Sequence, residues 1–351
     1  MIPPGETIGI LGGGQLGRMI AMAAAQLGYR CHVYAPEADS IAAEVAAQFT
    51  CAAWDDAEAM ARFAADCAVV TYEFENIPVS DLAALGSAVL TPNARALEVA
   101  QDRLNEKAFV AGLGGRPAPF SPVATAGDLA AAIAAIGTPG ILKTCRDGYD
   151  GKGQWRIMSP ADAHAVELTG TPLVYEGFVR FEAEFSVIAC RGADGDVRFW
   201  DSAGNEHEGG ILARSTVPAP DVIAAHVPEA RDLARKVADA LDYVGVLTLE
   251  FFATADGPVF NEMAPRVHNS GHWTIEGALT SQFENHVRAI CGLPLGDTAL
   301  ACKGAVMKNL IGDDAHDWPL ILSDPANHLH LYGKAAARPG RKMGHVTRLV
   351  L

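Results

Sequence analysis

A glycine-rich stretch near the N-terminus constrains the fold more than any other feature. In "IGILGGGQLGRM" (8–19), Gly12, Gly14 and Gly17 form the pattern G-x-G-x-x-G. The apolar residues before them predict a buried parallel strand, and the alanine-rich run from Gln15 to Leu27 predicts a helix. Glu37 follows a second predicted strand, "RCHVYAPE", where an acidic residue can hold a ribose. These residues alone favour an NAD-dependent dehydrogenase.

Bulk properties narrow the class of protein. The chain has 351 residues, of which 50% are hydrophobic, so two or three domains are expected. A formal charge of −15 argues against a nucleic-acid partner, because a phosphate backbone demands a basic face. We find no signal peptide and no apolar window long enough to span a bilayer, which predicts no membrane association. The seven cysteines are odd in number and widely spaced, which fits a reducing cytoplasm.

The order of predicted elements changes near residue 92. Strands and helices alternate from Thr7 to about Pro92, with a helix expected around "IAAEVAAQF" (41–49), which indicates a doubly wound α/β domain. A single helix is then expected from about Ala94 to Ala111. Short strands separated by glycine-rich turns follow, which is typical of an α+β unit.

A second glycine loop lies between two strand-like runs in "GILKTCRDGYDGKGQWRIM" (140–158). A Walker loop would need a helix after the glycines and its lysine inside the motif, and this stretch has neither. We therefore predict a hairpin flap. Its glycines would let backbone N–H groups approach phosphate oxygens, while Lys143 and Lys152 supply positive charge. An ordinary flexible hairpin tip is the alternative.

Two glutamates are predicted to face each other across a hairpin. The segment "VLTLEFFATADGPVFNEMAPR" reads as strand, turn and strand, with a three-residue loop expected at 255–257. In that register Thr254 faces Pro258, and Glu250 faces Glu262. Directly opposed carboxylates are destabilising unless a cation lies between them, so we predict a Mg²⁺ site completed by substrate phosphates. Two solvated glutamates are the alternative, which the apolar flanks disfavour.

Five segments carry a family resemblance: "GILGGGQLGRM", "AQDRLNEK", "GYDGKGQW", "NEMAPRVHNSGHWTIEGALTSQFENHVRAI" and "GKAAARPGRKMGH". With these, the chain resembles the ATP-grasp superfamily, and within it the 5-(carboxyamino)imidazole ribonucleotide synthetases of purine biosynthesis. Asp147 departs from the pattern, because glycine is more usual there. The resemblance implies an ATP-grasp fold of mixed α/β and α+β class, preceded by a small Rossmann-like domain.

The domain boundaries follow from this resemblance. We expect the Rossmann-like domain at 1–97 and the ATP-grasp domain at 98–297, with a mobile lid at about 119–180. A C-terminal segment at 298–351 would complete the ligand site. The implied reaction joins ATP, bicarbonate and 5-aminoimidazole ribonucleotide, through carboxyphosphate, to give the N-carboxylated ribonucleotide, ADP and phosphate.

The resemblance also implies a set of nucleotide and metal contacts. Glu176 and Val179 would read the adenine through their backbone, and Glu184 would hold the ribose hydroxyls. Glu250 and Glu262 match the magnesium ligands of the family. The full set of nucleotide contacts is Arg103, Lys143, Gly148, Tyr149, Asp150, Gly151, Lys152, Gly153, Gln154, Glu176, Gly177, Phe178, Val179, Glu184, His207, Asn261 and Glu262.

A further set would bind and react the other substrates. Asp150, Arg266, His268 and Lys334 are implied as catalytic residues. Basic side chains in "GKAAARPGRKMGH" would bind the ribose 5′-phosphate, because this segment is locally basic although the chain as a whole is acidic. The implied contacts with the ribonucleotide or bicarbonate are Gln15, Leu16, Glu73, Tyr149, Asn269, Ser270, Lys334, Arg341 and Lys342.

Several alternatives stay open at this point. Another ATP-grasp carboxylate–amine ligase, such as the formate-using glycinamide ribonucleotide enzyme, is the nearest rival. A dehydrogenase and a catalytically inactive relative are the others. On the favoured interpretation the first glycine loop borders the ribonucleotide and Glu37 merely ends a strand. The family also implies a homodimer.

Overall fold

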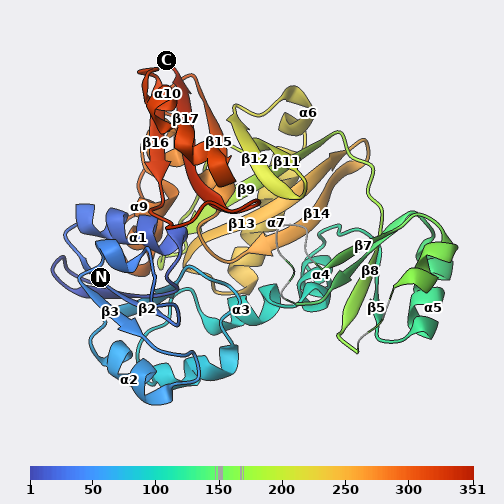
Figure 1. Ribbon diagram of the computed structural model, residues 1–351, viewed down its shortest axis with the longest axis horizontal. Coiled ribbons are helices and arrows are strands. Elements are labelled where there is room, and N and C mark those ends of the chain that lie inside the picture. Colours follow the sequence, from blue (N-terminus) through green and yellow to red (C-terminus); the bar gives the residue numbers. More distant parts are fainter. Residues whose placement is uncertain (147, 149–152, 167, 169) are drawn as a thin grey trace.

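The computed structural model describes residues 1–351 except 147, 149–152, 167 and 169. Three β-sheets organise this part of the chain, and Figure 1 shows the N-terminal domain, the small green sheet and the large sheet arranged around a common centre. The first sheet is parallel, with the strand order β3-β2-β1-β4. Its elements are β1 (Thr7–Leu11), α1 (Gln15–Gln26), β2 (Arg30–Ala35), η1 (Ala43–Val45), β3 (Gln48–Cys51), α2 (Ala57–Ala65), β4 (Val69–Tyr72) and η2 (Val79–Leu85).

The predicted doubly wound domain is confirmed, but the helix expected at 41–49 is wrong. That segment forms only the short 3-10 helix η1 before the chain enters β3, which pairs in parallel with β2. Phe49, Thr50 and Cys51 suit a strand, and pairing with His32–Ala35 overrides the helix propensity of the preceding alanines.

The single helix expected over 94–111 is also wrong, because two helices occupy this region. They are α3 (Ala94–Ala100) and α4 (Arg103–Gly112). Asp102 caps α4, since its carboxylate accepts hydrogen bonds from the backbone N–H groups of Leu104 at 3.0 Å and Asn105 at 3.3 Å. The break places Arg103 in the first turn of α4.

The second sheet is small and antiparallel, with the order β5-β8-β6-β7. It packs against α5 (Ala126–Ile136) around Leu129, Leu142 and Tyr175. The 3-10 helix η3 (Pro160–Ala165) adjoins it. The strands are β5 (Phe120–Val123), β6 (Gly140–Thr144), β7 (Gln154–Ile157) and β8 (Leu173–Gly177).

The third sheet has nine strands and provides most of the site. Its main order is β14-β13-β9-β11-β12-β15-β17-β16, and β10 pairs with β9. The strands are β9 (Ala183–Arg191), β10 (Val197–Phe199), β11 (Ala203–Glu208), β12 (Ile211–Val217), β13 (Gly245–Thr254), β14 (Gly257–Ala264), β15 (Gly304–Ile311), β16 (Asn327–Leu331) and β17 (Lys342–Val350). The C-terminal strands therefore extend the same sheet that carries Glu250 and Glu262.

Helices join this sheet to the N-terminal domain. A continuous core extends from β1 and α1 to α9 and the interior of the large sheet, through residues such as Ile20, Val287 and Val246. The remaining helices are α6 (Asp221–Ala224), α7 (Val227–Ala240), η4 (Asn269–Gly271), α8 (Thr274–Gly277), α9 (Gln282–Ile290), η5 (Gly312–Asp317) and α10 (Trp318–Leu322). Within the described ranges, no helix has the length and apolar character needed to cross a bilayer.

Candidate active site

Glu250 and Glu262 are cross-strand partners in the β13–β14 hairpin, as the sequence predicts, but a bulge is needed to bring them together. The predicted three-residue loop is wrong, because Thr254 pairs with Gly257 and leaves a two-residue loop. That register would place Glu250 opposite Asn261. A bulge between Glu250 and Phe251 accommodates Asn261 as the extra residue and restores the pairing of the two glutamates.

Each of these carboxylates has a cationic or polar partner. His268 Nε2 lies 3.0 Å from Glu250 Oε1, and Arg103 Nη1 lies 3.2 Å from Glu262 Oε2. Burial raises the pKa of Glu250, but His268 and His207 outweigh this effect and lower it below the usual value. Each carboxylate therefore has a side-chain nitrogen within ion-pair distance, from His268 for Glu250 and from Arg103 for Glu262.

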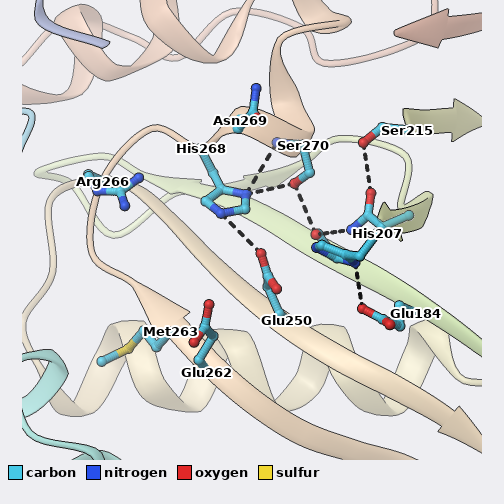
Figure 2. Close-up of polar contacts among 12 residues, drawn as sticks. Glu184, His207, Ser215, Glu250, Glu262, Met263, Arg266, His268, Asn269 and Ser270 are labelled. Carbon is cyan, nitrogen blue, oxygen red and sulfur yellow. Dashed lines mark hydrogen bonds and ion pairs between the residues drawn. The ribbon is translucent and has the colours of Figure 1, made fainter. Parts of the chain in front are cut away.

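A second ion pair lies along the same face of the sheet. Glu184 on β9 and His207 on β11 are 2.6 Å apart (Figure 2). Burial lowers the pKa of His207, but the adjacent Glu184 carboxylate more than compensates, so the pKa is raised overall. Glu184, His207 and Glu250 thus line one continuous polar surface.

A narrow pocket of about 60 Å³ opens between the small and large sheets. Its walls are mostly apolar, and Phe181 and Phe252 stack there with ring centroids 4.6 Å apart. The predicted adenine-binding residues Gly177, Phe178 and Val179 line it. A flat apolar slot between two sheets suits a planar aromatic base.

Charged side chains close one end of this pocket. Lys143 Nζ lies 2.8 Å from Glu176 Oε2, and Lys107 Nζ lies 3.3 Å from Glu176 Oε1. Burial raises the pKa of Glu176, but the two lysines outweigh it and lower the pKa below its usual value. Lys107 also donates to the backbone carbonyl of Asn261 at 3.2 Å. The sequence analysis missed Lys107, although it lies one helical turn after Arg103 on α4.

The predicted flap begins and ends as a hairpin. Strands β6 and β7 pair antiparallel, with Lys143 opposite Gln154, and no helix follows the described glycines of the loop. Gly153 has φ +67°, a conformation that favours glycine. The carbonyl of Gly148 accepts a hydrogen bond from Arg103 Nη2 at 3.0 Å. The predicted contacts Tyr149, Asp150, Gly151 and Lys152 lie outside the described residues.

A larger pocket of about 270 Å³ opens on the N-terminal domain. Gln15 at the start of α1 and Glu73 just after β4 line it from the N-terminal domain, and Lys334 and Arg341 line it from the C-terminal segment. Glu37, which the sequence placed at the end of a strand, lines the pocket too. Leu16 packs its side chain into the hydrophobic core instead.

The first glycine loop holds a carboxylate of the protein itself. The N–H groups of Gly14 and Gly17 lie 2.8 Å and 3.4 Å from the two carboxylate oxygens of Glu73. A Cβ atom on Gly12 would come within 2.6 Å of the Glu73 side chain. The anion-binding end of α1 is thus occupied by Glu73, which leaves no place for the pyrophosphate of a dinucleotide. This arrangement argues against the dehydrogenase.

Arg266 is held by an acidic residue that the sequence analysis missed. Both carboxylate oxygens of Glu75 accept hydrogen bonds from the Arg266 guanidinium, the Nη2–Oε1 distance being 2.5 Å. Burial raises the pKa of Glu75, but Arg266 outweighs it and lowers the pKa overall. Glu75 follows Glu73 by two positions in "YEFE", in the segment directly after β4.

The remaining predicted substrate contacts gather around η4 and the start of β17. Asn269 Nδ2 donates to Asn309 Oδ1 at 3.0 Å, and the Ser270 hydroxyl oxygen lies 2.8 Å from His268 Nδ1. Lys334 Nζ donates to the backbone carbonyl of Lys342 at 2.7 Å. Of these residues, Lys334 lines the larger pocket.

The small antiparallel sheet beside the large sheet, with the narrow pocket between them and the opposed glutamates on the large sheet, is the arrangement of an ATP-grasp protein. Comparison with family models agrees. Residues 109–283 match the ATP-grasp domain, residues 5–101 the ribonucleotide synthetase preATP-grasp domain, and residues 305–350 the phosphoribosylaminoimidazole carboxylase C-terminal domain.

Full-length relatives identify the family within this class. The N5-carboxyaminoimidazole ribonucleotide synthase of Brucella melitensis is 51% identical over 355 residues, covering 99% of this chain and 97% of that protein. The crystal structure of the synthetase from Thermus thermophilus is 47% identical with a TM-score of 0.91, covering 97% of this chain and 93% of that one. The Aspergillus clavatus structure in complex with ADP and 5-aminoimidazole ribonucleotide is 33% identical with a TM-score of 0.91, covering 98% and 94%. The chain belongs to the N5-carboxyaminoimidazole ribonucleotide synthase family.

Proposed function

We propose that this protein uses ATP to carboxylate 5-aminoimidazole ribonucleotide with bicarbonate, in purine biosynthesis. The observation that carries the proposal is the cross-strand pair of Glu250 and Glu262 next to Asn261, which lines the narrow apolar pocket. Phosphoryl transfer needs a metal ion that neutralises the charge of the phosphates, and two carboxylates beside the pocket can hold one.

The nucleotide would occupy the narrow pocket. The aromatic walls at Phe181 and Phe252 suit the adenine, and the Glu184–His207 pair suits the ribose. Arg103 and Lys143 would contact the phosphates, and the flap at Gly148–Gln154 would cover them. In this arrangement the Lys143–Glu176 pair orients the lysine before the nucleotide arrives.

Mg²⁺ fits the pair of glutamates. Oxygen ligands from one or two carboxylates plus substrate phosphates are the coordination that Mg²⁺ prefers. In the described part of the chain no cluster of three or more His, Cys, Asp or Glu side chains is placed to hold a metal, which fits a site that phosphates complete. Glu250 and Glu262 would hold the ion, which would neutralise charge on the transferred phosphoryl group.

The ribonucleotide would occupy the larger pocket. Lys334 and Arg341 would bind its 5′-phosphate, and Glu73 and Gln15 would border the rest of the molecule. Lys342 belongs to the same basic segment as Lys334 and Arg341 and would add to the charge around the 5′-phosphate. Arg266, His268, Asn269 and Ser270 would form the bicarbonate and carboxyphosphate end. Asp150 in the flap and Lys334 would then lie near the reacting amine.

The chemistry explains why these parts are brought together. A bicarbonate oxygen attacks the γ-phosphorus of ATP, the bond to the bridging oxygen breaks, and ADP leaves with carboxyphosphate formed. The amine of the ribonucleotide then forms the new C–N bond as phosphate departs, and a base takes the amine proton. Arg266 would stabilise the phosphoryl charge, and Asp150 is the candidate base. The closed flap would exclude water, which would otherwise hydrolyse the intermediate.

The direct test is ADP release that requires both bicarbonate and 5-aminoimidazole ribonucleotide. Appearance of the N-carboxylated product in step with ADP supports the proposal. ADP formed equally well with formate would point to a glycinamide ribonucleotide ligase. No ADP with any of these substrates would favour an inactive relative and overturn the proposal.

We extend the proposal to the organisation of the protein. We propose a division into 1–97, 98–297 with a lid at 119–180, and 298–351. The first part contains the parallel sheet and the lid contains the small antiparallel sheet, whereas the C-terminal segment continues the large sheet of the ATP-grasp domain. A homodimer in the cytoplasm is proposed on the family resemblance. Sedimentation at several concentrations would test the dimer, and cell fractionation would test the location.

A further inference from the structure

One face of helix α4 contacts the strand that carries Glu262. Strand β14 is the first strand of the large sheet, so it pairs with β13 along one of its edges. The outer edge of an end strand leaves backbone N–H and C=O groups that need partners from elsewhere. Figure 1 shows α4 between the small and the large sheet, beside β14. The first residue of this helix is Arg103, whose Nη1 lies 3.2 Å from Glu262 Oε2.

Two further residues of α4 bond to the backbone of β14 on either side of this glutamate. Glu106 Oε1 accepts a hydrogen bond from the Met263 N–H at 2.5 Å. Lys107 Nζ donates to the Asn261 carbonyl at 3.2 Å. Arg103, Glu106 and Lys107 have the spacing i, i+3 and i+4, which places them on one face of a helix. This face therefore holds the carboxylate and the peptide groups before and after it.

The bulge in the β13–β14 hairpin explains why the contact of Lys107 matters. Asn261 is the extra residue of the bulge, so it has no cross-strand partner on β13. Ladder pairing does not fix its peptide group, and a bulged strand can bend at this point. The Lys107 ammonium group bonds to this peptide group from the outer edge of the strand.

Both side chains lie deep in the protein. Glu106 is 2% exposed and Lys107 is 0% exposed. Polar and charged groups are stable at such depth only when they have partners. Lys107 has a second partner, since its Nζ lies 3.3 Å from Glu176 Oε1 on β8 of the small sheet. Hydrophobic side chains of similar size would fill the same space without this desolvation cost, which favours a role in the site over a role in packing.

We propose that Glu106 and Lys107 clamp the backbone of β14 and thereby fix the Glu262 carboxylate in the position that binds Mg²⁺. They are positioning residues, because they act through the strand that carries Glu262. Mg²⁺ demands near-ideal coordination geometry, so a carboxylate on a loosely held strand would bind it less well. The inference rests on the proposed function of the paired glutamates as metal ligands.

Glu106→Gln and Glu106→Leu separate the hydrogen bond from the size of the side chain. A glutamine carbonyl can accept the Met263 N–H as the carboxylate does, whereas leucine cannot. Amide hydrogen exchange reports how well this N–H is held, and NMR of ¹⁵N-methionine-labelled protein can follow it without metal or nucleotide. The chain has eight methionines, and Met263→Leu identifies the signal. We expect Glu106→Leu to accelerate the exchange on the order of tenfold and Glu106→Gln to exchange as the wild type does.

Metal binding gives the second readout. Mn²⁺ takes oxygen ligands as Mg²⁺ does, and electron paramagnetic resonance measures its binding in the presence of ADP. We expect Glu106→Leu and Lys107→Met each to weaken Mn²⁺ binding on the order of tenfold, and Glu106→Gln to bind it as the wild type does. Circular dichroism checks the folding of each variant. Lys107→Met tests the other half of the clamp if Glu106→Leu does not fold.

Asn285→Leu is the matched control. Asn285 is also buried, and its Oδ1 accepts a backbone hydrogen bond from the Gly296 N–H at 2.7 Å. The substitution therefore removes the same kind of contact, but from α9 instead of α4. It should change neither the exchange of the Met263 amide nor the affinity for Mn²⁺.

Three results would overturn the inference. The first is unchanged exchange of the Met263 amide in Glu106→Leu, and the second is unaltered Mn²⁺ affinity in Glu106→Leu or Lys107→Met. The third is an equal loss in Glu106→Gln and Glu106→Leu, which would mean that charge acts instead of the hydrogen bond. A wild type that binds no Mn²⁺ with ADP would remove the metal site and the inference together. Neither readout requires carboxylation, so the expected pattern in a protein that forms no N-carboxylated product would contradict only the proposed reaction.

Discussion

Glu75 anchors Arg266 to the N-terminal domain through both of its carboxylate oxygens. The anchor is itself fixed, since Gln101 Nε2 donates to the backbone carbonyls of Glu75 at 2.7 Å and Ile77 at 2.6 Å. The same short segment carries Glu73, which borders the larger pocket. Arg266 is therefore held by the segment that also shapes the proposed ribonucleotide site.

Glu75→Gln should lower kcat on the order of tenfold to a hundredfold. The amide keeps the size of the side chain but leaves Arg266 without its charged partner, free to leave the productive position. The KM for ATP should change little, because neither Glu75 nor Arg266 lines the narrow pocket proposed for the nucleotide. Steady-state kinetics measure both constants. Glu284→Gln removes a matching carboxylate, paired with Arg288 on α9, and should leave kcat unchanged. Equal kcat in the wild type and Glu75→Gln would show that the pair is dispensable.

Gly14→Ala should weaken the binding of the ribonucleotide. Its Cβ would lie 2.9 Å from Glu73 Oε1, so the carboxylate must leave the glycine N–H groups and enter the pocket. We expect the KM for the ribonucleotide to rise at least about tenfold, a change of about 1.4 kcal/mol. Gly112→Ala is the control, because no atom lies within 4 Å of its Cβ position. Titration calorimetry measures the affinity of each variant for the ribonucleotide. Equal affinities of Gly14→Ala and Gly112→Ala would disprove the prediction.

Glu262→Gln should abolish Mg²⁺-dependent turnover while the protein stays folded. One of the two opposed carboxylates is lost, and Arg103 keeps a hydrogen-bonding partner of the same shape. Turnover across a range of Mg²⁺ concentrations, with circular dichroism as the check on folding, provides the measurement. Glu208→Gln at the end of β11 should behave as the wild type. Near-normal turnover of Glu262→Gln would refute the role of the paired glutamates.

The sequence predicted the parts of the site that depend on local pattern. Alternation of strands, the glycine loop and the hairpin pairing of Glu250 with Glu262 follow from short-range spacing. The register near the turn was wrong because one inserted residue at a bulge leaves no mark in the hydrophobic pattern. The helix break at Asp102 was missed for another reason. Asp102 is an N-cap residue, but the residues on both sides of it favour helix, so the pattern predicts one continuous helix.

Contacts between segments that are distant along the chain could not be predicted from the sequence. Glu75 accepts hydrogen bonds from Arg266, which lies 191 positions away in the sequence. Lys107 donates to the carbonyl of Asn261, which lies 154 positions away. No spacing rule joins such residues, because their proximity depends on how the sheets pack. The same holds for Glu37, whose position after β2 was clear but whose place in the pocket depends on the C-terminal segment. Lone charged residues within apolar stretches are the one hint that the sequence offered.

Arg341→Ala should raise the KM for the ribonucleotide far more than the KM for ATP. Arg341 lines the larger pocket, and loss of a charged hydrogen bond to a phosphate costs about 1.5 to 3 kcal/mol. That corresponds to a change of roughly tenfold to a hundredfold. Arg348→Ala removes an arginine of β17 that lies outside this basic motif and pairs with Asp324, so it should have little effect. A larger change in the KM for ATP than in that for the ribonucleotide would place the 5′-phosphate elsewhere.

His286 should make the folded protein less stable as the solution becomes mildly acidic. It is fully buried between the N-terminal domain and the large sheet, where its Nδ1 accepts the Val246 N–H at 3.2 Å and its Nε2 lies 2.9 Å from Thr71 Oγ1. Burial lowers its pKa to about 4, against about 6.5 in an unfolded chain. The unfolded state therefore binds more protons between these values, so stability rises with pH across this window and is constant above it.

The size of the effect follows from the same two pKa values. As the pH falls from about 6.5 towards 4, protonation linked to His286 should lower the free energy of unfolding by about 3 kcal/mol. Urea unfolding of the wild type and of His286→Gln at about pH 7 and pH 5 isolates this contribution, because other buried histidines cancel in the difference. The variant should be less stable at pH 7 but lose less stability on acidification. His316→Gln alters an exposed histidine and should follow the wild type. Parallel losses in the wild type and His286→Gln would mean that His286 does not stay neutral in the fold.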